Sequence, residues 1–572
     1  MNGVKENKAR RSFQASSILF VVVIAVIMML VLVPIGYMLY ESCTNDMGAF
    51  TLENFVRYFK RKSIRESLRN TLLVSAGIGG FGTLLGVTLA FGVSRTNMRF
   101  KTLVKSTIII AIMTPPFLIT LAYIILAGPN VGFVNRVLRW LFKLDTSYGP
   151  VNIYSVWSLV ILGLPQGIAT IFMMVFPAME NMDPYLEAAS SQNLFDVNEY
   201  VPEYWTSLNI TIPLVRPALL SGLILSFGQS LALYGVPRML NINVLTTKIR
   251  ESVTVMDFKM GAVLSVTVTV LSLLAVFLYR RTVRSSKKYS TISAKGFRPS
   301  VMKLGKSRHL FSALGLVYAL FGFLIPYCTL LMASFMRSVG NGFEVSNWTL
   351  SNYASLINSA VAKTALKNSV FLGIMTATCV VLLGLMAAFI IVRLKIRGRG
   401  ALEYLCNMPS GISGTALAMG LIFMYLSKPL NSFHLYGTIW LLLIAYVTRM
   451  LPSGVRYCQS ALIQINTELE EASRISGASW GQTTRKVTVP LARTGMVYAW
   501  ILTFVMAFPE LSSSVMLRNA GTDVVATAIL DLWDGAGGLP QAAAFGTVVF
   551  LLVTLLVILA QKVTGHSMID RS

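Results

Sequence analysis

The hydrophobic pattern of the chain is a series of long apolar runs separated by polar segments. A helix of about 20 apolar residues crosses a hydrocarbon core of roughly 30 Å. Runs of that length lie at about 18–40, 71–94, 104–127, 152–178, 214–234, 259–280, 311–335, 368–393, 402–426, 436–458, 495–514 and 541–562. The first run follows the basic segment "KENKARR" and has no small-residue cleavage site, so we expect it to remain as a span. The pattern predicts an all-α polytopic membrane protein with about 12 transmembrane helices.

The two halves of the chain resemble each other at a constant offset. "FTLENF" from Phe50 matches "WTLSNY" from Trp348, and "SLRNTLLV" matches "ALKNSVFL", both 298 residues apart. The same offset relates Gly86, Ala90, Phe91 and Arg95 to Gly384, Ala388, Phe389 and Arg393. Agreement across a polar loop and a helix without a gap indicates an internal duplication. Six crossings per copy make the two six-helix repeats parallel.

The duplication predicts the following division of the chain. Residues 1–17 form a cytoplasmic tail, 18–280 the first transmembrane domain, 281–310 a basic cytoplasmic linker, 311–563 the second transmembrane domain and 564–572 a second cytoplasmic tail. Both termini are expected in the cytoplasm.

Composition supports a membrane protein and argues against nucleic-acid binding. Hydrophobic residues make up 55% of the chain and charged residues 13%, whereas soluble proteins carry about 25% charged residues. The net charge is +25, but the basic residues are concentrated in the linker and in short loops, as the positive-inside rule describes. Contact with the lipid bilayer accounts for them. The five cysteines are isolated and the three histidines scattered, so we expect no metal site and no bound cofactor.

Two related polar segments follow the fourth span of each repeat. They are "LEAASSQNLFDVNEYVPEYWTSLNITIPLVRPA" from Leu186 and "LEEASRISGASWGQTTRKVTVPLARTG" from Leu469, within loops at about 180–213 and 464–491. Each is expected to form a short helix and a turn. In the second segment, Thr467 and Glu470 fit a capping box, and Gly477 suits a left-handed helix end.

The pattern E-A-A/S-x-x-x-G/N, followed by a Pro-Leu pair, resembles the EAA loop of the permease subunits of type I ABC importers. The resemblance covers about 70–240 and 365–540. It implies the type I ABC importer permease fold in a bacterial plasma (inner) membrane. It also implies partners: cytoplasmic ABC ATPase subunits that carry ATP–Mg, expected as a homodimer, and an extracytoplasmic substrate-binding protein. The first loop departs from the pattern, because Asn193 replaces glycine and seven extra residues precede the proline.

The resemblance assigns ATPase coupling to a set of residues in the two loops. These are Glu187, Ala188, Ala189, Asn193 and Pro213 in the first, and Glu471, Ala472, Ser473, Gly477 and Pro490 in the second. The alternative is that both segments are ordinary solvated connections. Two related segments at matching places favour coupling.

The sequence gives fewer indications of a translocation path. Gln229 and Glu510 lie near the ends of the predicted fifth and eleventh spans, and a carboxylate near a membrane core often lines a pathway. The alternative for Glu510 is an interfacial, solvated position. Pro115, Pro116 and Pro409 interrupt the third and ninth spans, and kinks there can open a cavity.

No motif in the chain predicts an enzyme. "GIGGFG" from Gly77 lies within a span without a preceding strand, so it fits close helix packing at Gly82 and Gly86 better than nucleotide binding. "GASWGQTT" from Gly477 lacks the lysine of a phosphate-binding loop. ATP hydrolysis is therefore expected on a partner chain.

The fused double repeat resembles ferric-iron permeases most, with thiamine and aminoethylphosphonate permeases as alternatives. "ELSSSVMLRNAGTDVVATAI" and "GVPRMLNINVLTTKI" add to the likeness to ferric-iron permeases. A different class, an ion-coupled secondary transporter, also fits two six-span repeats, but it would need several ionisable residues within the spans. The sequence leaves open which small solute is carried and the Gram type of the source.

Overall fold

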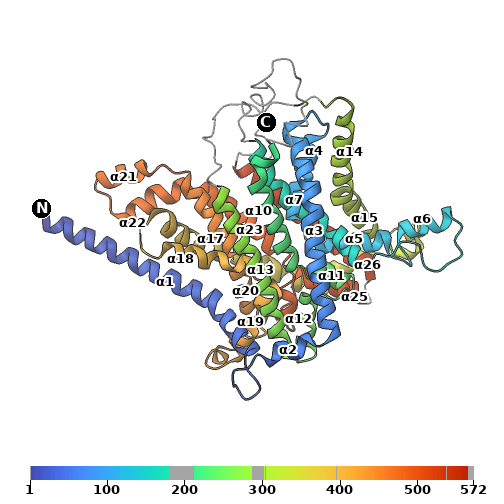
Figure 1. Cartoon of the computed structure of the whole chain (residues 1–572), viewed down its shortest axis with the longest axis horizontal. Helices are drawn as coiled ribbons and strands as arrows, with labels where there is room; N and C mark the ends of the chain where they lie inside the picture. Colours follow the sequence, from blue (N-terminus) through green and yellow to red (C-terminus); the bar gives the residue numbers. More distant parts are fainter. Residues whose placement is uncertain are drawn as a thin grey trace.

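The computed structural model describes residues 2–180, 211–286, 302, 304–394, 396–535 and 538–564. In these ranges every named element is a helix (Figure 1). Those of the first half are α1 (Asn2–Ser42), α2 (Glu53–Phe59), α3 (Lys62–Arg95), α4 (Lys101–Met113), α5 (Pro116–Ala127), α6 (Phe133–Leu141), α7 (Val156–Glu180), α10 (Ile212–Leu231), α11 (Gly235–Met239), α12 (Leu245–Thr254) and α13 (Phe258–Ser286).

The second half repeats this order. Its main helices are α14 (Arg308–Ala319), α15 (Ile325–Ser334), α16 (Ser351–Asn358), α17 (Ala360–Arg393), α18 (Arg399–Asn407), α19 (Gly414–Leu426), α20 (Ile439–Ile463), α21 (Thr467–Ile475), α22 (Trp480–Thr483), α23 (Val489–Ala507), α24 (Ser514–Leu517), α25 (Val525–Asp534) and α26 (Gly538–Thr564). A π-helical turn, η3 (Leu320–Leu324), joins α14 to α15, a 3₁₀ turn, η6 (Met408–Gly411), follows α18, and a π-helical turn, η8 (Thr484–Thr488), precedes α23.

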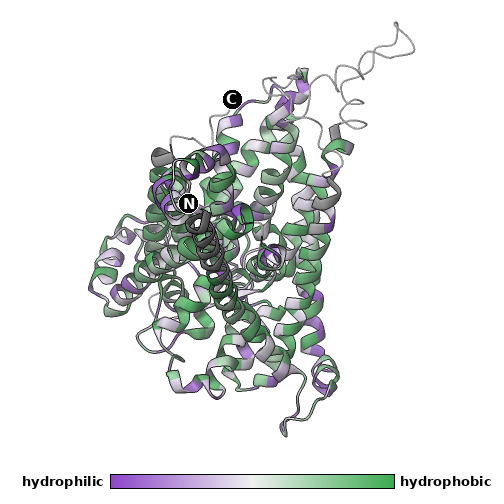
Figure 2. Ribbon diagram, turned by 90° about the vertical axis from the view of Figure 1, so that its left-hand side faces the viewer, coloured by the Kyte–Doolittle hydropathy of each residue, from purple (hydrophilic) through white to green (hydrophobic). Residues whose placement is uncertain are grey.

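Ten helices of the described chain are long and apolar enough to cross a membrane. Hydrophobic residues cover most of their length (Figure 2). The predicted third and ninth spans are not single helices: α4 and α5 meet at 105°, and α18–η6 meets α19 at 109°. Counting each bent pair as one span gives twelve.

The bends form where the sequence interrupts helical hydrogen bonding. Pro115 and Pro116 are adjacent and supply no backbone N–H, so α4 ends at Met113 and α5 starts anew with Pro116 in its first turn. In the second half, η6 contains Pro409, and the hydroxyl of Ser413 caps α19 by accepting from the Ala416 N–H. The predicted proline interruptions are therefore confirmed, and they are sharper than kinks.

The duplication is confirmed by matching elements. α3 and α17 both contain 34 residues, and their ends correspond at the predicted offset. Each packs closely on the fourth-span helix of its half through a glycine. A Cβ at Gly86 would lie 3.0 Å from the Ile168 carbonyl oxygen on α7, and a Cβ at Gly384 would lie 3.0 Å from the Gly454 carbonyl carbon on α20. Small residues at these crossings let the helix backbones approach.

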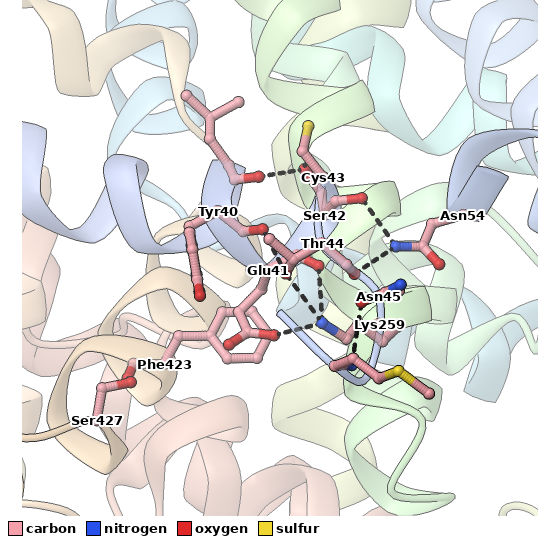
Figure 3. Close-up of polar contacts among 12 residues, drawn as sticks. Tyr40, Glu41, Ser42, Cys43, Thr44, Asn45, Asn54, Lys259, Phe423 and Ser427 are labelled. Atoms are coloured by element: carbon pink, nitrogen blue, oxygen red, sulfur yellow. Dashed lines mark hydrogen bonds and ion pairs between the residues drawn. The ribbon is translucent and has the colours of Figure 1, made fainter. Parts of the chain in front are cut away.

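The turns before α3 and α17 share one asparagine-centred arrangement. The Asn54 amide donates to the carbonyls of Ser42 and Thr44 at 3.1 and 2.9 Å (Figure 3). Asn352, 298 residues later, donates to the Ser334 and Met336 carbonyls at 2.9 and 2.7 Å. Buried carbonyls need such partners, so the asparagine fixes the fold of each turn.

The two halves are interleaved. α1 of the first half packs against α19 of the second, and α15 of the second packs against α5 of the first. The contact between α1 and α19 is close, because a Cβ at Gly420 would lie 2.6 Å from the Pro34 carbonyl oxygen. Each bent pair is therefore covered by the first span of the opposite half, and the region between the halves holds the central cavity.

Candidate coupling helix and central cavity

The second polar segment folds into the predicted short helix. α21 covers Thr467–Ile475 and is followed by Gly477, whose φ of +89° confirms the left-handed end. The predicted capping box is wrong: the cap is Asn466, whose side-chain oxygen accepts from the Glu468 N–H at 3.1 Å. Glu470 does not turn back to the start of the helix, because its carboxylate is held elsewhere.

Glu470 fastens α21 to the membrane-spanning helices. Its Oε1 lies 3.0 Å from Arg393 Nε at the end of α17, and it accepts from the Thr488 hydroxyl at 3.0 Å just before α23. The Arg393 Nη2 also donates to the carbonyls of Leu462 in the last turn of α20 and of Ile465 just after it. Both charged side chains are nearly buried, each 9% exposed. Sequence reasoning assigned Glu470 to a capping box and missed this attachment role, although Glu470 stands next to the predicted Glu471.

The opposite face of α21 is open. Glu471 and Ala472 are exposed, as are the apolar side chains of Leu469 (50%) and Ile475 (87%). Ser473 is half-buried, and its hydroxyl lies 3.1 Å from that of Thr483 on α22. The segment thus presents apolar and acidic groups outward from a rigidly attached helix.

The first segment is only partly described. Glu187, Ala188, Ala189 and Asn193 lie outside the described residues. Pro213 stands in the first turn of α10, as Pro490 does in the first turn of α23. Prolines are tolerated there because the first helical N–H groups have no intrahelical partner.

Both predicted path residues line one central cavity. Its volume is about 360 Å³, and both halves contribute to its wall. The bends after α4 and at η6 form part of that wall through Thr114, Pro115 and Pro409. The polar side chains that line it include Gln166, Gln229, Ser272, Ser410, Arg449, Ser453, Arg456, Glu510 and Ser512.

Glu510 is not a solvated interfacial residue. It is 7% exposed, and its Oε2 lies 3.2 Å from Arg449 Nε on α20. Its Oε1 accepts from the Ser513 N–H at 3.0 Å. Gln229 on α10 is uncharged, and its Oε1 accepts from the Thr170 hydroxyl on α7 at 3.0 Å.

Sequence reasoning missed the two arginines in this wall. Arg449 and Arg456 lie seven residues apart, so they share one side of α20. Both fall within the predicted span 436–458, and an arginine inside a span is rare and commonly functional. That position was the signal that could have identified them.

The family comparison matches the second half of this architecture. Residues 380–569 match the family described as "Binding-protein-dependent transport system inner membrane component". This range contains α21 and all three described charged residues of the cavity wall. The chain is a fused, two-domain ABC importer permease. The ion-coupled secondary transporter is thereby set aside.

One relative of this permease covers most of its length, and another covers less than half of it. It is 27% identical over 547 residues to "Ferric transport system permease protein FbpB" of Actinobacillus pleuropneumoniae, covering 93% of this chain and 76% of the relative. It is also 27% identical over 237 residues to "Putative 2-aminoethylphosphonate transport system permease protein PhnV" of Salmonella paratyphi A, covering 41% of this chain and 87% of the relative. The first relative spans both halves of the permease, and the second has the length of one.

A solved structure overlays on part of the permease. It is a chain of a bacterial alginate ABC transporter in complex with an alginate pentasaccharide-bound periplasmic protein. It covers 46% of the permease and 97% of its own length at 18% identity, with a TM-score of 0.38. This overlay adds nothing to the identification.

Proposed function

We propose that the permease forms the translocation path of an ATP-driven importer that receives its cargo from an extracytoplasmic binding protein. Separate cytoplasmic ATPase subunits would bind ATP–Mg and dock on α21 and on the corresponding first loop. The family description, which names binding-protein-dependent transport, supports the binding protein as a partner. The inner membrane, with both termini in the cytoplasm, is the location that this arrangement requires.

The attachment of α21 is the observation that carries this proposal. A helix that moves an adjoining span must be fixed to it, and the Arg393–Glu470 ion pair, 3.0 Å long, provides that connection. The exposed Leu469, Ala472 and Ile475 on α21 leave an apolar face for a partner to cover. Exposed apolar groups of this kind mark interaction sites when they lie together.

Ferric iron is the first cargo that we propose. The support is the ferric transport relative, whose likeness extends over 93% of this chain. 2-Aminoethylphosphonate is the second candidate, supported by the relative of that name. Thiamine stays a prediction from the sequence resemblance alone.

The test is ATP-dependent uptake into proteoliposomes that contain the permease, its ATPase and its binding protein. Replacing Ala472 by arginine on the exposed face of α21 should lower uptake and ATPase co-purification at least tenfold, because a long charged side chain blocks close docking. Ala401→Arg, at an exposed position on α18, is the matched control and should keep both. Equal retention of the ATPase by the two variants would contradict the proposed docking face.

A further inference from the structure

The charges in the wall of the central cavity do not balance. Two guanidinium groups, Arg449 and Arg456, face one carboxylate, Glu510, and no other Asp, Glu, Lys or His is among the described residues that line it. The cavity therefore carries a net charge of about +1. Because a site within a membrane protein is poorly screened by water, such a charge strongly selects the sign of what enters.

In the part of the chain that the structure describes, Glu510 leaves part of the Arg449 guanidinium without a hydrogen-bond partner. One carboxylate oxygen pairs with Arg449 Nε, and the other is occupied by the Ser513 N–H. Arg449 Nη1 is buried without a hydrogen-bond acceptor among the described residues, and it lies where a side chain at Gly414 would collide with it. Gly414 starts α19, and a helix N-terminus adds positive potential. The arginine is thus held where a further negative charge would be stabilising.

Arg456 supplies a second positive group closer to α21. It lies two turns beyond Arg449 on α20, about 10 Å along the axis. Its side chain is exposed and reaches only uncharged groups, the Asn407 side-chain oxygen at 3.5 Å and the Ser453 hydroxyl at 3.3 Å. No ion pair of Arg456 occurs within the described residues. Its guanidinium is therefore available to an incoming anion.

The bent helices reinforce this field. α5 has 12 residues and α19 has 13, and both begin at bends that adjoin the cavity. The N-terminal end of α19 lies against Arg449, and the first residues of α5 line the same cavity. The arrangement resembles transporters whose broken helices point their N-termini at anionic groups. Gln166 and Gln229 on the facing wall add amide donors without charge.

We propose that the cavity carries its cargo as an oxyanion. The cargo is either a small anion of the phosphonate type or a metal ion that crosses together with an oxyanion. Guanidinium groups bind phosphate-like and carboxylate oxygens well. A bare trivalent cation would meet two positive groups and a single carboxylate that is already paired. Among the described residues no group of three His, Cys, Asp or Glu side chains could hold a metal ion. This inference rests on the proposed import function and narrows its substrate class.

The sign of the cavity potential can be measured without knowing the cargo. Ser410, which is exposed and lines the cavity, is replaced by cysteine in the full chain after Cys43, Cys328 and Cys379 are changed to serine. The thiol is then reacted with a sulfonate-bearing and with a trimethylammonium-bearing methanethiosulfonate. The measured quantity is the ratio of the sulfonate reagent's reaction rate to that of the trimethylammonium reagent. We expect this ratio to be higher for the introduced cysteine than for a small free thiol in solution. Arg456→Gln should lower that ratio about tenfold, because it removes a positive charge near the thiol; the guanidinium of Arg456 and the hydroxyl of Ser410 both contact Asn407.

Arg397→Gln, at an exposed position outside the cavity, is the matched control and should leave the ratio unchanged. A faster reaction of the cationic reagent in the parent chain would overturn the proposal. So would an unchanged ratio in Arg456→Gln. Neither result depends on an ATPase, so both are independent of whether the docking proposal holds.

Uptake assays in the reconstituted importer distinguish the two sources of the oxyanion. Labelled iron is supplied with labelled phosphate or citrate, and labelled 2-aminoethylphosphonate is supplied separately. Entry of iron and anion together supports the metal–oxyanion form, and entry of the phosphonate supports the small anion. Either uptake should fall at least tenfold in Arg456→Gln. Entry of iron without any anion, undiminished in this variant, would overturn the proposal while leaving the import function intact.

Discussion

In the first half of the permease, the cavity wall is uncharged, with Gln166 on α7 and Gln229 after it on α10. In the second half, the same wall carries Arg449, Arg456 and Glu510. When Pro165 of α7 is aligned with Pro452 of α20, and Pro213 with Pro490, the positions that match the three charged residues are Leu162, Ala169 and Leu233. Both partners of the buried ion pair therefore belong to the second copy alone.

This difference contrasts with the framework that the copies share. The long helices α3 and α17, the asparagine-centred turns and the bends of 105° and 109° correspond closely. The duplication has kept the residues that fix backbone geometry, while the residues that face the cavity have diverged. A field that comes from one side only gives the cavity an electrical polarity that a symmetric pair of copies would lack.

The largest effect is expected from breaking the ion pair. Glu510→Leu introduces the residue that the first half has at the matching position, Leu233. The substitution leaves Arg449 without its counter-charge, which should lower the free energy of unfolding by about 3 kcal/mol. Adding Arg449→Leu should restore much of the lost stability, because both charges are then gone. The apparent Tm of the detergent-solubilised permease measures this. A double variant that is less stable than either single variant would show that the pair stabilises the fold by itself.

A smaller effect, equal in both halves, is expected at the helix crossings. Gly86→Leu and Gly384→Leu should each destabilise the permease by about 2 kcal/mol, because backbone atoms of the facing helix lie 3.0 Å from the added Cβ. Gly80→Leu is the control on α3, since no atom lies within 4 Å of a Cβ there. The apparent Tm should fall in the first two variants and stay unchanged in the third. Unequal decreases in apparent Tm at Gly86 and Gly384 would contradict the structural equivalence of the two copies.

The smallest effect is expected at the two turns. Asn54→Ala and Asn352→Ala each remove two hydrogen bonds to backbone carbonyls. Each substitution should lower the free energy of unfolding by at least about 1 kcal/mol. Hydrogen exchange of the turns should rise by a similar factor in both variants. Asn45→Ala is a comparison for the first turn, because Asn45 is exposed and its side-chain oxygen accepts only from the Met47 and Ala49 N–H groups. An effect confined to one half would show that its turn is held mainly by other contacts.

Sequence reasoning recovered the parts of the fold that depend on local pattern and on repetition. Apolar runs located the spans, and the constant offset located the duplication. Adjacent prolines located the third-span interruption, but the size of the bend depends on how α4, α5 and α26 pack, which no local pattern contains. The Asn466 cap was missed because Glu470 is drawn to Arg393, a partner 77 residues away in the chain.

The candidate site was only partly predictable, for a similar physical reason. Gln229 and Glu510 were identified as path candidates, and both reach the cavity. Their neighbours depend on which face of α20 turns inward, and this orientation is set by the packing of α20 on α17 and α23. Arg449 and Arg456 could have been found as intramembrane charges, whereas the pairing of Arg449 with Glu510 required the three-dimensional structure.

The packing of α1 on α19 has a consequence for biosynthesis. Ser42, the last residue of α1, is separated from Gly414, the first residue of α19, by more than 370 residues. At about 5–20 residues per second, the ribosome needs roughly 20–75 s to produce the second helix after the first. During that interval α1 lies in the membrane before α19, its packing partner, has been synthesised. Because both helices belong to one polypeptide, each α1 is followed by one α19, which inserts into the same region of the membrane.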